Sequence, residues 1–111
     1  MEDKIVKLLL SLGMAPTSKG FRACVCAIEL ILEDPEVLDK ITKRLYPEVA
    51  KRLKMACKSA EHSIRRAVER MFEYQEYDQI VGTLGLETNR QKGKYTNSEF
   101  LSLCAMKLKN A

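Results

Sequence analysis

The sequence predicts an all-α fold, a compact bundle of about six helices. Apolar residues recur every three or four positions along most of the chain, and no stretch shows the alternation of a strand. Residues that cap or break helices separate these apolar patterns. With 111 residues, of which 46% are apolar, the chain is long enough for one core, so we expect a single domain over residues 1–111.

The first two helices are delimited by capping residues, glycine and proline. We expect Asp3 to cap a helix that ends at Gly13 and Pro16, and Ser18 to cap a second helix that reaches about Glu33. The second helix has an apolar stripe broad enough for a central, largely buried element. The apolar positions of the two helices are Ile5, Leu8, Leu9 and Leu12, and Phe21, Val25, Ile28, Ile31 and Leu32.

Two prolines divide the middle of the chain. Asp34 and Pro35 should start a third helix. Pro47 should break that helix, because proline disfavours helical geometry in the residue before it. A short fourth helix then covers residues 47–54, and the longest helical pattern covers residues 56–74.

The C-terminal part combines a short helix, a polar loop and a capped helix. We expect one or two helical turns at residues 79–84 and an extended, basic loop at residues 86–96, which is a candidate contact loop. Caps for a final helix follow in residues 96–98. The apolar face of that helix comprises Phe100, Leu101, Leu103, Cys104 and Leu108.

The four cysteines and the one histidine do not form a metal-binding pattern. Cys24 and Cys26 are two residues apart in a helical stretch and point in different directions, and Cys57 and Cys104 stand alone. We therefore expect buried or partly buried reduced thiols, no metal and no cofactor. The apolar run at residues 8–12 is too short for a signal sequence or a membrane span, so we expect a cytoplasmic protein without a membrane partner.

Positive charge is concentrated in residues 43–70. This segment contains nine basic and three acidic residues, a net charge of +6, although the whole chain carries only +4. Such a field on one supersecondary unit is expected of a surface that faces phosphates. A charged run is also compatible with a helix face that is merely solvated, and the two alternatives differ in geometry.

The basic segment has the pattern of a helix-turn-helix. A turn at residues 54–57 joins the short helix to the long one, and small Ala50 and Ala60 should permit their close crossing. Lys54 stands where many such turns carry Gly or Asn, and a plain helical hairpin remains the alternative. The inward stripe of the long helix comprises Ala60, Ile64, Ala67, Val68 and Met71. The residues turned outward or flanking are Lys58, Ser59, Glu61, His62, Arg65, Arg66 and Glu69.

Three sequence blocks resemble one known family. They occur in the family's order and together span nearly the whole chain. They are Gly13-Met14-x-Pro16 with Lys19-Gly20-Phe21, Ile41-Thr42-Lys43-x-Leu45-Tyr46-Pro47-x-Val49-Ala50-Lys51, and Thr96-Asn97-Ser98-Glu99-Phe100. In these blocks the chain is similar to the C-terminal effector domain of the stage zero sporulation protein A family, bacterial response regulators of sporulation. The resemblance implies a DNA-binding transcription regulator with its recognition helix at residues 56–74.

The resemblance also implies a changed DNA preference. Glu61, Ile64, Arg65, Ala67 and Glu69 match the pattern of the family's recognition helix. The differing positions are Lys58, Ser59, His62 and Arg66, where the family usually has Ser, Arg, Arg and His. The family's phosphorylated receiver domain is absent from these residues, so the chain is either an excised domain or a stand-alone relative.

We therefore expect a sequence-specific DNA-binding protein and not an enzyme, because no nucleophile, acid-base pair or Gly-rich phosphate loop is evident. Its partner is double-stranded DNA, with RNA polymerase and a second copy of the chain as further candidates, at the bacterial nucleoid. The alternative is a protein-interaction module, or a degenerate paralogue that modulates a full-length regulator. The candidate DNA contacts are Lys51, Arg52, Lys58, Ser59, Glu61, His62, Arg65 and Arg66, with Lys92 and Lys94 in the basic loop.

Overall fold

Helices make up all the regular structure in the part of the chain that the structure, a computed structural model, describes, residues 2–84 and 95–110. The predicted all-α class and the number of helices are confirmed. The elements are α1 (Glu2–Ser11), α2 (Lys19–Glu33), a 3-10 segment η1 (Pro35–Lys40), a π-helical segment η2 (Ile41–Leu45), α3 (Tyr46–Leu53), α4 (Cys57–Tyr74), α5 (Tyr77–Leu84) and α6 (Asn97–Lys109).

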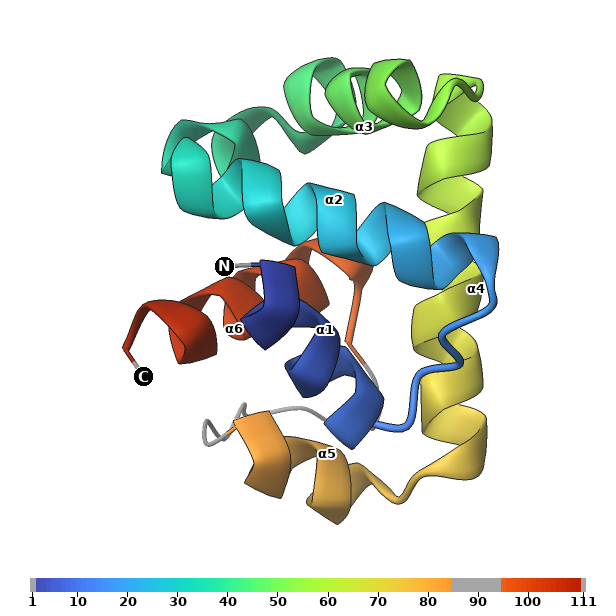
Figure 1. Cartoon of the computed structure of the whole chain (residues 1–111), viewed down its shortest axis with the longest axis vertical. Coiled ribbons are helices and arrows are strands. Elements are labelled where there is room, and N and C mark those ends of the chain that lie inside the picture. Colours follow the sequence, from blue (N-terminus) through green and yellow to red (C-terminus); the bar gives the residue numbers. More distant parts are fainter. Residues whose placement is uncertain (1, 85–94, 111) are drawn as a thin grey trace.

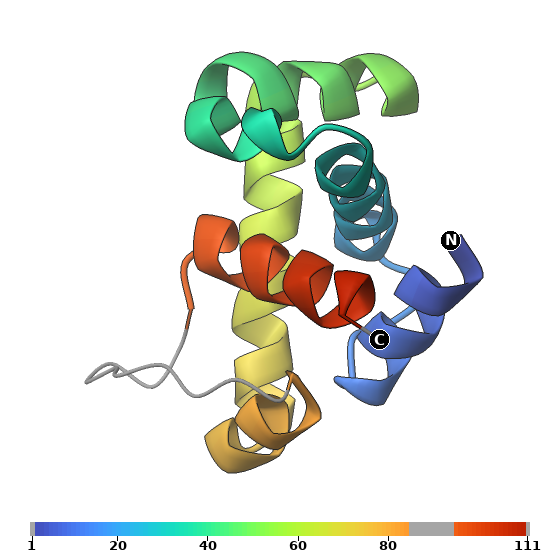
Figure 2. The ribbon, with the colours of Figure 1, turned by 90° about the vertical axis from the view of Figure 1, so that its left-hand side faces the viewer.

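Helix α2 is the centre of the arrangement. It crosses the middle of the molecule with α3 on one side and α1 and α6 on the other, and α4 runs along one edge (Figure 1). Turned by 90°, the molecule shows α6 crossing α4, with α1 beside it (Figure 2). Ten of the fifteen residues of α2 are buried, which confirms the prediction of a central element.

Local capping chemistry sets several helix ends. Ser18 accepts a hydrogen bond from the amide of Phe21 at 3.0 Å, and Thr96 and Glu99 form a capping box at the start of α6. Gly13 follows α1 with a φ of 85°, a conformation that glycine adopts without strain. The prediction for Asp3 was wrong, because α1 includes Glu2 and Asp3 lies inside its first turn.

The predicted break at Pro47 was also wrong. The expected single third helix is a tight 3-10 segment followed by a wider π segment, which runs directly into α3. Tyr46 keeps helical angles, φ −62° and ψ −42°, although a proline follows it. Pro47 lies in the first turn of α3, directly after the π-helical segment, and its fixed φ suits that position, so the chain stays helical.

The close contact between α2 and α4 depends on Gly20. A Cβ atom at Gly20 would overlap the carbonyl oxygen of Ser63 and the side chain of Ala67 on α4. The predicted small residues Ala50 and Ala60 are both buried, at 4% and 0% exposure, but sequence reasoning missed the packing role of Gly20. A glycine therefore sets how closely α4 approaches the central helix.

Three of the four cysteines are buried. Burial raises the pKa of Cys24 to about 12 and raises the pKa values of Cys26 and Cys104, so these thiols stay protonated. Cys57 is exposed in the first turn of α4, so the expectation of burial was wrong for this residue. None of the helices in the described ranges has the length and apolar character needed to cross a membrane.

We expect Gly20→Ala to lower the free energy of unfolding by about 1–3 kcal/mol, because overpacking at the α2–α4 contact outweighs the better helix propensity of alanine. Gly82→Ala is the matched control: its new Cβ meets no atom within 4 Å, so it should stabilise by about 0.5–1 kcal/mol. Urea unfolding of both variants measures the difference. Equal stability of the two variants would contradict the proposed tight contact.

Candidate nucleic-acid interface

Helices α3 and α4 form the predicted helix-turn-helix. Helix α3 ends at Leu53 and is capped by Lys54, whose backbone is left-handed with φ 56° and ψ 53°. The amides of Lys54 and Met55 both donate to the carbonyl of Ala50, which closes the turn. Lysine takes the conformation that glycine or asparagine would take more easily, at a cost of about 1–2 kcal/mol, so this departure does not prevent the motif.

The two faces of α4 are as predicted. The inward stripe at Ala60, Ile64, Ala67, Val68 and Met71 is at most 8% exposed and packs into the core. On the opposite face the residues Lys58, Ser59, His62, Arg65, Arg66 and Glu69 are exposed, and Glu61 is half-buried. The burial of one stripe thus presents a polar, mostly basic surface along the first half of the helix.

The start of α4 has no side-chain cap within the described residues. Ala56 precedes the helix in an extended conformation, φ −74° and ψ 152°, and its methyl group accepts no hydrogen bond. The first amides of a helix have no intrahelical acceptor, and here no capping oxygen takes them up. These amides and the helix dipole favour an anion at this end of α4.

Arg65 is held by two neighbours on its own helix. Its Nη1 lies 3.1 Å from Oε2 of Glu61, and its Nη2 lies 3.1 Å from Nδ1 of His62. The side chains of Arg65 and Glu61 are 49% and 33% exposed, so solvent screens the pair and an external ligand can replace it at small cost.

The remaining candidate cations differ in their partners. Arg52 pairs with Glu48 at 3.3 Å and with Glu33 at 3.7 Å. Within the described ranges, Lys51, Lys58 and Arg66 are exposed and form no ion pair, so their charges are available to an anionic ligand. The predicted contacts Lys92 and Lys94 lie outside the described residues.

Asn97 joins the start of α6 to both helices of the motif. Its side-chain amide donates to Oη of Tyr46 at 3.1 Å and to the carbonyl oxygen of Glu61 at 3.2 Å. Burial raises the pKa of the Tyr46 phenol, which stays neutral and polar at this junction. Sequence analysis named Asn97 only as a cap, although it stands in one of the three motif blocks.

Comparison with known families assigns the chain to one of them. Residues 5–108 match the family described as Sporulation initiation factor Spo0A C terminal. The chain belongs to this family. The match confirms the resemblance to this family, and the matched range includes all three motif blocks and the whole helix-turn-helix.

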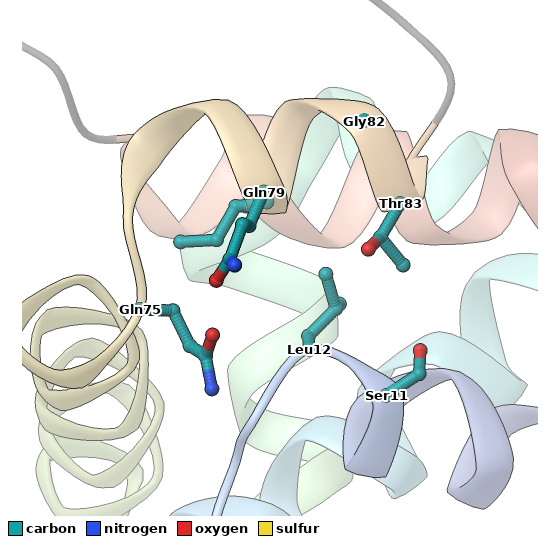
Figure 3. Close-up of a pocket in the computed structure, with 7 residues that line it drawn as sticks. Ser11, Leu12, Gln75, Gln79, Gly82 and Thr83 are labelled. Atoms are coloured by element: carbon teal, nitrogen blue, oxygen red, sulfur yellow. The ribbon is translucent and has the colours of Figure 1, made fainter.

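Spo0A C-terminal domains are DNA-binding effector domains of response regulators that control transcription in sporulation, and they do not form an enzyme family. A hollow of about 460 Å³ lies beside α1 and α5 (Figure 3). It is lined by Ser11, Leu12, Gln75, Gln79, Ile80, Gly82 and Thr83. None of these side chains is an acid or base near neutral pH, so this hollow offers no general acid-base pair.

For this Spo0A C-terminal domain, we expect Asn97→Ala to lower the free energy of unfolding by about 1–3 kcal/mol, because two hydrogen bonds between helices are lost. Tyr46→Phe removes only the phenol oxygen and should cost about 0.5–1.5 kcal/mol. Ser98→Ala, an exposed neighbour, is the control and should change stability by less than about 0.5 kcal/mol. Thermal unfolding tests this, and an Asn97→Ala variant as stable as Ser98→Ala would refute the bridging role.

Proposed function

We propose that this chain is a sequence-specific transcription regulator that inserts α4 into the major groove of double-stranded DNA. The observation that carries the proposal is the exposed basic face on the first half of α4, directly after the turn of a helix-turn-helix. Residues at the start of the second helix of this motif reach base edges in known complexes. Membership of a DNA-binding family supports the same function.

The candidate residues divide into two roles. Arg65 is long and forked enough to donate two hydrogen bonds to a guanine, and Glu61 can accept from the amino group of a cytosine. Ser59 and His62 have shorter polar groups toward the same groove. The cations Lys51, Arg52, Lys58 and Arg66 bind phosphates, as do Lys92 and Lys94 in the proposal.

The proposal places the protein in the bacterial cytoplasm, at the nucleoid, with RNA polymerase as a further partner and a second copy bound beside it on DNA. It includes no enzymatic role. Among the described residues no three His, Cys, Asp or Glu side chains gather closely enough to hold a metal ion. A purified chain that binds no duplex would favour the protein-interaction module instead.

Arg65→Ala should weaken binding to the element selected from random duplexes by about 1–3 kcal/mol, because a bidentate base contact is lost. Arg65→Lys keeps the charge but not the fork, so it should lose most of the same specificity. Both side chains are at an exposed position, and the melting temperature should not change. The measurement is a titration against the selected and a scrambled duplex, and wild-type affinity in the Ala variant would exclude a base contact.

Ser59→Arg combined with His62→Arg should recover preference for the family's usual DNA element by about 1–3 kcal/mol per contact, because forked donors replace short ones. Wild type should discriminate poorly between that element and a scrambled duplex. Gln79→Arg with Met106→Arg adds the same charge at exposed positions outside the motif and serves as control. Competition titrations at one salt concentration compare the three proteins. Strong preference in wild type would show that residues 59 and 62 are not the altered base contacts.

A further inference from the structure

Five cations surround the junction between the start of α2 and the helix-turn-helix. Lys19, Arg66 and Arg70 line a hollow of about 500 Å³ between α2 and α4, and the guanidinium of Arg70 lies 6.0 Å from the ring centre of Tyr74. Lys19 and Arg22 line a second hollow of about 180 Å³, together with Lys54 from the turn. Because Lys19 belongs to both hollows, it joins Arg22, Lys54 and Arg66 into one continuous surface, and we call these four residues the α2 patch.

The charges of the α2 patch are available to an anionic ligand. All four side chains are exposed, and within the described ranges none of them forms an ion pair. No carboxylate lines either hollow. Arg52 and Arg65, by contrast, are paired with glutamates. The patch is therefore a source of positive potential that no ion pair in the described part of the chain neutralises.

Two of these cations come from outside the basic segment of the sequence. Lys19 and Arg22 stand in the first turn of α2, more than twenty positions before that segment begins at residue 43. The contact of Gly20 with Ser63 and Ala67 brings this turn against α4. The fold thus adds charge to one border of the exposed face of α4, where Arg66 already lies.

We infer that the α2 patch binds the sugar-phosphate backbone of the same duplex whose major groove receives α4. The inference rests on the proposed function. Lys54 lies in the turn three residues before α4 begins, and Arg66 belongs to the exposed face of α4. The DNA strand that borders a groove occupied by α4 would pass beside such residues. Cations without intramolecular partners neutralise phosphates and release counterions, which contributes affinity without base preference.

The test removes Lys19 and Arg22, the two cations of the α2 patch that lie outside the basic segment of the sequence. In Lys19→Gln with Arg22→Gln, the slope of log K against log salt concentration should become shallower by about 2, one for each phosphate contact. Affinity should fall by the same factor for the selected element and for a scrambled duplex. Lys4→Gln with Lys7→Gln is the matched control, since it removes two exposed lysines with the same spacing from α1, and its slope should equal that of wild type.

The outcomes separate this inference from the proposed function. If the α2 variant has the same slope as wild type, the inference is wrong. An acidic protein would then be the candidate ligand of the patch. A loss of affinity confined to the selected element also overturns the inference, because phosphate contacts do not depend on sequence. If wild type itself binds no duplex, the proposed function fails and the inference falls with it. A slope that changes equally in the α1 control would show only a net-charge effect and would also overturn it.

Discussion

The close packing of α4 on α2 is the constraint on which the rest of the structure depends. Because Gly20 lets the two helices approach closely, the apolar stripe of α4 is buried and its basic face must point outward. The same contact places the first turn of α2 beside that face. On the other side, Asn97 ties α6 to Tyr46 and to the backbone of α4. Helix α4 is therefore held from two directions by elements outside the motif.

Much of the fold could be predicted because its signals are local. Ser18 and Thr96 cap helices through bonds to amides three residues away, and the stripe of α4 follows from spacing alone. The 3-10 and π segments could not be predicted, since their irregular turns depend on packing around them. The bond between Asn97 and Tyr46 joins residues 51 positions apart, a distance that periodicity does not encode.

The candidate site was predictable to a similar degree. Once the stripe of α4 faces inward, helical geometry turns Lys58, His62 and Arg65 outward, as observed. The pair of Glu61 with Arg65 has the spacing of a helix ion pair and was visible in the sequence, although its meaning for the site was not. Lys19 was not predictable as a neighbour of Arg66, because charge counted along the chain ignores contacts between distant helices.

On the proposed function, the pairing of Arg65 with Glu61 and His62 affects how the domain tells DNA sites apart. A base-reading arginine usually discriminates because the wrong base leaves its donors unsatisfied in a dry interface. If Arg65 reads a base as proposed, it can return to Glu61 and His62 when the base does not fit, so its donors keep acceptors on either outcome. A mismatch at that base pair then carries a smaller penalty. On the proposed function, the domain would occupy a graded series of related promoter sites according to its concentration, instead of separating sites into bound and unbound classes.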